Sequence, residues 1–168
     1  MTTAIGNVAG DRMDQGDLRG AIQLYEESLQ DRDPADTGYA ALVGLNIAAI
    51  HQLQGNLAGA RQGFEQSLAI WQKNGDQGGS ADAMSALGSV LLEEADFSNA
   101  RKMYGQALAL RTSAGEKLSI AGTQFGLAEL SLEEGHSPVE QEAVIRQARD
   151  SGTTLTDKYY NRSETRHF

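Results

Sequence analysis

The residues of this chain that could do chemistry are scattered and do not form a catalytic or metal-binding pattern. The glycine-rich stretch at 75–79 lacks the Lys-Ser/Thr pair that completes a phosphate-binding loop. Adjacent carboxylates on a helix point about 100° apart, so Glu93 and Glu94, like the pairs at 26–27 and 133–134, do not make an acid–base dyad. None of the three histidines has a second histidine or a cysteine at metal-ligand spacing: His51, His136 and His167. The sequence therefore predicts neither an enzyme nor a metal or cofactor site.

The composition narrows the remaining classes of function. The 168 residues contain no cysteine, which excludes a disulfide scaffold and a thiol nucleophile. Lys and Arg number 14 against 23 Asp and Glu, giving a net charge of −9, and such a surface repels nucleic acid. No uncharged apolar run approaches the roughly 18–20 residues of a membrane helix, and the first residues do not resemble a secretory signal. We expect a cytoplasmic protein without a nucleic-acid or membrane partner.

The strongest pattern in the sequence is an internal repeat of about 40 residues. Four turns, spaced by 39, 40 and 40 residues, begin at Gly16, Gly55, Ala95 and Gly135. Five residues after the first three turns an alanine recurs: Ala21, Ala60 and Ala100. Nine residues after them an aromatic recurs: Tyr25, Phe64 and Tyr104. Agreement at several offsets indicates a real structural repeat.

Each unit predicts two helices joined by a turn. Apolar residues recur at intervals of three and four on both sides of the turn, as at Leu87, Val90 and Leu91 before the third one. Glycine at the turn suits a left-handed helix end. The residue that follows can cap the next helix: Asp17, Asn56 or Asp96.

A small residue, a Gly-Asp turn, a later alanine and an aromatic together resemble the tetratricopeptide repeat. The tract from Gly55 to Asp76 is similar to the longer variant of 40–42 residues found in bacterial regulatory proteins and kinesin light chains. The resemblance implies an all-α fold, a right-handed α-solenoid of about four helix-turn-helix repeats. Ala95 departs from the family pattern, because it replaces the turn glycine.

The repeat also sets the expected domain boundaries. We expect an array over residues 1–150, with repeats at about 2–36, 37–76, 77–116 and 117–150. Residues 151–168 break the period and are predicted to form a flexible polar tail rather than a short capping helix. The array begins inside a first helix, so we expect a fragment of a longer array.

The resemblance implies that ligands contact one face of each first helix, which would line a concave groove. Asn7 and Asn46 occupy the position where the family often uses an asparagine to bind a peptide backbone, although ordinary solvated polarity explains them equally well. The candidate partner-binding residues are Asn7, Asp14, Leu42, Leu45, Asn46, Leu53, Asp82, Ser85, Ser89, Glu93, Phe125, Glu129 and Glu133.

The charge of these positions predicts the kind of partner. They include five acids and no Lys or Arg, so we expect a basic or apolar protein segment and not an acidic chain terminus. The sequence thus predicts a protein–protein interaction or scaffold module, the regulatory part of a larger bacterial protein. Two alternatives stay open: a small-ligand or short-peptide sensor, and a structural array that self-associates weakly through uncapped ends.

Overall fold

The computed structural model describes residues 8–13, 15–30, 33, 35–135 and 146. Residues 8–13 are helical, and the described part of the chain contains no strand. Six longer helices follow: α2 (Leu18–Gln30), α3 (Thr37–Leu53), α4 (Leu57–Asn74), α5 (Gln77–Glu93), α6 (Phe97–Ala114) and α7 (Lys117–Glu133). The predicted all-α fold of helix-turn-helix repeats is confirmed. The expected tail at 151–168 lies outside the described residues, as does most of the second helix expected in the fourth repeat.

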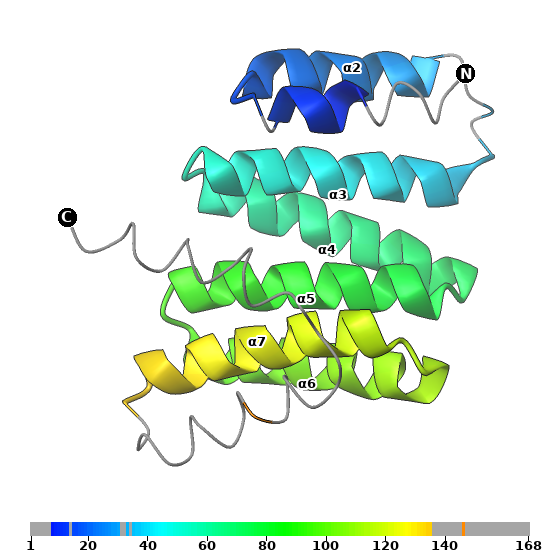
Figure 1. The fold of residues 1–168 in the computed structure, drawn as a ribbon. Helices are drawn as coiled ribbons and strands as arrows, with labels where there is room; N and C mark the ends of the chain where they lie inside the picture. The colour runs from blue at the N-terminus through cyan, green and yellow to red at the C-terminus, as the bar shows by residue number, and fades with distance from the viewer. Residues whose placement is uncertain (1–7, 14, 31–32, 34, 136–145, 147–168) are drawn as a thin grey trace.

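The helices pack in the order in which they follow one another along the chain (Figure 1). The closest pairs are α3 with α4 and α5 with α6, and α4 then packs on α5. The first helices of successive repeats also touch, since α3 contacts α5 and α5 contacts α7. Among the described helices, the second helices α2, α4 and α6 contact one another less than the first helices α3, α5 and α7 do. The first helices therefore lie closer together than the second helices.

The turns between helices have the predicted geometry. Gly16, Gly55 and Gly135 have φ of +80°, +76° and +71°, in the left-handed region that glycine enters without strain. Ala95 takes the same conformation, with φ of +59°, although it carries a Cβ atom. The expected caps are confirmed as well: Asn56 Oδ1 accepts a hydrogen bond from the Gly59 N–H at 3.0 Å, and Asp17 and Asp96 cap the equivalent helices.

The core is built from small residues where helices meet and aromatic residues that reach the next repeat. Ala48 and Ala60 are fully buried and share one cluster with Phe64. The same cluster includes Leu87 and Val90 of the following repeat. Burying an aromatic ring between repeats is what makes each hairpin depend on its neighbour, because one hairpin cannot hide both of its apolar faces. Within the described ranges, no helix is both long and apolar enough to cross a bilayer.

A repeated ion pair joins successive repeats at the surface. Arg61 on α4 contacts Glu94, at the end of α5, with 3.1 Å between Nη1 and Oε2. One repeat later, Arg101 on α6 contacts Glu134, at the end of α7. Each arginine lies six residues after its turn, and each glutamate precedes the next turn. The 40-residue period therefore governs surface contacts as well as the core.

Candidate partner-binding face

The predicted binding residues that the structure describes lie on α3, α5 and α7, and we call this surface the first-helix face. It comprises Leu42, Leu45, Asn46, Leu53, Asp82, Ser85, Ser89, Glu93, Phe125, Glu129 and Glu133. The other two predicted residues, Asn7 and Asp14, lie outside the described residues. Since α3 contacts α5 and α5 contacts α7, the face extends across three repeats without interruption.

Large exposed apolar side chains in the described ranges occur only on first helices. Leu42 and Leu53 on α3 are 45% and 52% exposed, and Phe125 on α7 is 38% exposed. Two more belong to this set and were not predicted as binding residues: Val8 and Leu132. Leu132 lies seven residues after Phe125, two turns along the same side of α7, so a wider helical stripe would have included it. Leu45 and Asn46 are half-buried.

Hydrogen bonds tie α3 to α5 on this face. The Gln52 side chain donates from Nε2 to Ser89 Oγ at 3.0 Å and to Glu93 Oε1 at 2.6 Å. Two predicted residues, Ser89 and Glu93, are therefore held in place by a residue of the preceding repeat. The sequence gives no sign of this role for Gln52, because the residue is not part of the repeated pattern.

Tyr104 reaches the same part of the face from the second helix α6. Its ring passes between two glycines, since a Cβ atom added to Gly88 on α5 or to Gly126 on α7 would come within 2.8 or 2.6 Å of the ring. Burial raises the pKa of the Tyr104 hydroxyl, and the negative charges of Glu129 and Glu93 raise it further, against the opposing hydrogen bond with Ser89. The carboxylates of two repeats thus lie close enough to act on one phenol.

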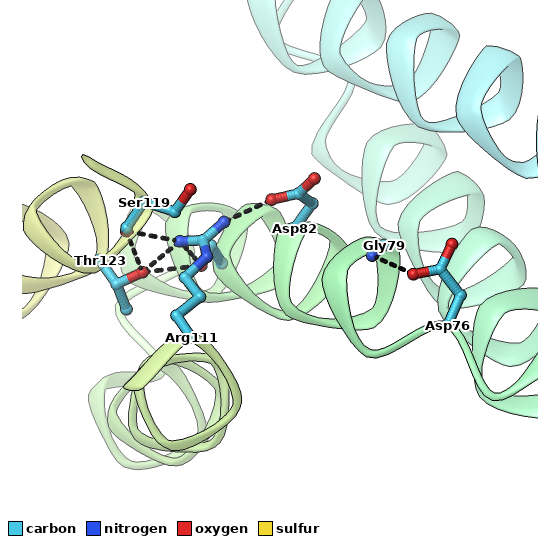
Figure 2. Close-up of polar contacts among 7 residues, drawn as sticks. Asp76, Gly79, Asp82, Arg111, Ser119 and Thr123 are labelled. Atoms are coloured by element: carbon cyan, nitrogen blue, oxygen red, sulfur yellow. Dashed lines mark hydrogen bonds and ion pairs between the residues drawn. The ribbon is translucent and has the colours of Figure 1, made fainter. Parts of the chain in front are cut away.

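Arg111 is the residue that the sequence pattern missed. It extends from α6 and places its guanidinium between α5 and α7 (Figure 2). Nη2 donates to Asp82 Oδ1 at 2.5 Å, and Nη1 donates to Ser85 Oγ at 3.0 Å, to the Ser119 carbonyl at 3.0 Å and to Thr123 Oγ1. The side chain is only 8% exposed, whereas that of Asp82 is 57% exposed.

The Arg111 contact corrects the predicted charge of the face. Asp82 was counted among five acids without a basic neighbour, but it pairs with a cation that comes from a second helix. A stripe derived from first helices alone could not reveal a side chain that arrives from α6. The remaining described acids are Glu93, Glu129 and Glu133, in the last two turns of α5 and α7. The negative charge is thus concentrated at one end of the face.

The described residues do not form a metal site near this face, and the cavity beside Arg111 is small. No group of three or more His, Asp or Glu side chains in the described ranges is arranged to hold a metal ion. A cavity of about 10 Å³ lies beside Arg111, where α5 begins and α6 ends, lined by Gln77, Ala81, Leu110 and Glu116 among others. That volume accommodates about one water molecule. The first-helix face thus offers a binding partner exposed contact area and negative charge.

Comparisons with known proteins agree with this geometry. Residues 39–113, which run from α3 into α6, match the tetratricopeptide repeat model. The chain is similar to BtubC (BKLC) from P. vanneervenii, with a TM-score of 0.69 and 21% sequence identity over 86% of this chain. It spans 59% of the length of that protein, and at this identity the likeness concerns the fold. A comparison with curated proteins finds no match in sequence. The match to the tetratricopeptide repeat model thus covers residues 39–113, the region of the second and third predicted repeats.

Proposed function

We propose that this chain is a non-catalytic module that binds a segment of another protein on its first-helix face. Tetratricopeptide domains are in general protein–protein interaction modules, which supports this class of function. The observation that carries the proposal is the position of the exposed apolar side chains. In the described ranges, four of the five large exposed apolar side chains lie on helices of the first-helix face: Leu42, Leu53, Phe125 and Leu132. Exposed apolar side chains gathered on one face are typical of a protein-binding surface.

The chemistry of the face supports a basic or apolar partner segment. The leucines and Phe125 offer apolar contact, and the three glutamates favour positive charge. The glutamates would repel an acidic segment, and the Arg111 guanidinium beside the face is already paired with Asp82. We further propose that the module acts in the cytoplasm as the regulatory part of a larger bacterial protein.

Two alternative functions are a small-ligand sensor and a self-assembling array. A small-ligand sensor would need a cavity, and the cavity beside Arg111 holds about one water molecule. A self-assembling array would bury end surfaces between copies, and two chains of net charge −9 repel each other. Sizing with light scattering checks the second alternative, since a monomer at high concentration excludes it.

The test uses the full chain and proteins from its native cell, identified by mass spectrometry. We expect Leu53→Ser combined with Leu132→Ser to lose the partners that the wild type retains, because both changes remove exposed apolar contact area. The matched control is Ala69→Ser combined with Ala109→Ser, at exposed positions of α4 and α6. Unchanged binding by the leucine variant, with unfolding curves like the wild type, would contradict the proposal.

A further inference from the structure

The site of Arg111 corresponds to an apolar site one repeat earlier. Arg111 and Trp71 both lie sixteen residues after the turn of their own repeat. Trp71 is buried in one cluster with Ala41 and Ala83. Its ring also lies so close to Gly79 that a Cβ atom added there would come within 2.4 Å of it. An aromatic ring therefore closes the joint between the second and third repeats.

The same positions are polar at the joint between the third and fourth repeats. The places of Gly79 and Ala83 are taken by Ser119 and Thr123. The Ser119 carbonyl and the Thr123 hydroxyl both accept hydrogen bonds from Arg111 (Figure 2). A well-packed apolar cluster often stabilises a protein at least as well as a buried ion pair does. Stacking of the repeats by itself therefore does not explain why this joint is polar.

The polar joint holds Asp82 in a fixed orientation on the first-helix face. Nη2 of Arg111 donates to Asp82 Oδ1 at 2.5 Å. Nη1 of the same guanidinium is bonded to Ser85 on α5 and to Ser119 and Thr123 on α7, which fixes its position. The Asp82 side chain is 57% exposed, and in Figure 2 its second carboxylate oxygen points away from the guanidinium. Asp82 thus presents an oriented hydrogen-bond acceptor at the surface.

From this arrangement we infer that Asp82 is a specificity-determining residue, which accepts a hydrogen bond from an uncharged polar side chain of the partner segment. A neighbouring apolar side chain of that segment packs on Leu42. Leu42 is 45% exposed and occupies the repeat position of Asp82 on the adjoining helix α3. The inference rests on the proposed function and names the kind of side chain that this part of the face selects.

The geometry and charge of the Asp82 site favour an uncharged donor over a cation. One carboxylate oxygen is bonded to Arg111, so a partner arginine cannot form the two parallel hydrogen bonds that make its carboxylate pairs strong. The positive charge of Arg111 offsets that of Asp82, so a lysine gains less here than at a carboxylate without a cation beside it. An uncharged donor also loses less hydration free energy on binding than a cation does. Because the carboxylate is already oriented, little entropy is lost when the donor binds.

Peptide selection tests which side chain the site prefers. The probe is a phage-displayed library of random dodecapeptides, selected in parallel on the immobilised full chain and on its Asp82→Ala variant. We expect the wild type to enrich peptides in which asparagine, glutamine, serine or threonine lies close to a large apolar residue. Asp82→Ala should lose the polar preference and keep the apolar one. Enrichment of lysine or arginine that Asp82→Ala abolishes would overturn the inference.

Glu65→Ala is the matched control for this selection. The Glu65 side chain is also 57% exposed and also pairs with an arginine, Arg61, but it lies on the second helix α4. The control variant should therefore enrich the same peptides as the wild type. Loss of the polar preference in both variants would show a general effect of removing a surface acid, and would contradict a local site at Asp82.

One selected peptide, made synthetically, measures the hydrogen bond itself. Leucine in place of its polar residue should weaken binding to the wild type by about three- to tenfold, as expected for one hydrogen bond. The same change should leave binding to Asp82→Ala unaltered, because the acceptor is already missing. The loss should be equal at about 0.05 and 0.5 M salt, since the donor is uncharged. Equal losses with both proteins would contradict the contact.

Amide chemical shifts of the full ¹⁵N-labelled chain separate this inference from the proposed function. If the selected peptides shift signals of α3 and α5 but the same sequences are selected on Asp82→Ala, the inference fails while the proposed function stands. If no selected peptide shifts signals of the first-helix face, the inference also fails. The native-partner experiment with Leu53→Ser and Leu132→Ser then decides the proposed function separately.

Discussion

At the scale of single residues, Arg111 joins the third repeat to the fourth through hydrogen bonds to both. One guanidinium bonds to Asp82 and Ser85 on α5 and to Ser119 and Thr123 on α7, while its own backbone belongs to α6. The charge is buried, so it depends on these acceptors in place of water. Nε is buried without a hydrogen-bond partner, which shows that the site is built around the two Nη groups.

This arrangement predicts unequal effects of changing the two ion-pair partners. We expect Arg111→Leu to lower the free energy of unfolding by about 2–4 kcal/mol, because it removes the donor from the buried Thr123 hydroxyl and from the half-buried Ser85 hydroxyl. Asp82→Asn should cost less than about 1 kcal/mol, because the Asp82 side chain is largely exposed and water can take its place. Urea unfolding of both variants measures the difference. Equal losses would show that the Asp82 charge, and not the bonds to α7, stabilises the buried arginine.

At the scale of helices and turns, the left-handed turn is the part of the repeat that the sequence specifies most directly. At the third turn the Asp96 N–H donates to the Leu91 carbonyl and the Ala95 N–H donates to the Leu92 carbonyl. This pair of hydrogen bonds closes the C-terminal end of a helix when the residue just after the helix, here Ala95, has a left-handed conformation. Ala95 is exposed and holds that conformation against the steric cost of its Cβ atom, so the packing of the two helices that it joins must impose it.

The strain at the third turn predicts a stabilising substitution. We expect Ala95→Gly to raise the free energy of unfolding by about 0.5–1 kcal/mol, since relief of the left-handed strain exceeds the added entropy of the unfolded chain. The reciprocal control is Gly55→Ala at the second turn, where φ is +76° and a loss of about 1 kcal/mol is expected. Thermal and urea unfolding give both values. A loss of stability in Ala95→Gly would contradict the strain.

At the scale of the whole molecule, stability follows the stacking of repeats. Helices α4, α5 and α6 have described neighbours on both sides, whereas the contact between α2 and α3 is less extensive than that between α3 and α4. In an array of this kind each repeat draws its stability from its neighbours. The central repeats should therefore be the most stable part of the described chain.

Amide hydrogen exchange measures this gradient directly. We expect amides in the middle of α4, α5 and α6 to exchange at least about tenfold more slowly than those in the middle of α2, because local opening near the edge of an array costs less free energy. Exchange followed by mass spectrometry resolves the helices separately. Uniform protection from α2 to α6 would instead indicate a single cooperative unit.

The sequence by itself determined the repeat, the turn positions, the helix caps and the aromatic residues that link repeats. Each of these depends on the type of one residue at a fixed offset, as with Gly55, Asn56 and Phe64, so a periodic pattern is enough to reveal it. Only the tertiary structure decided the electrostatics of the first-helix face. Arg111 and Tyr104 reach that face from a second helix, and Gln52 reaches Glu93 from the preceding repeat. Such contacts depend on how helices cross in space, and a long side chain can bridge helices whose sequence positions carry no shared pattern.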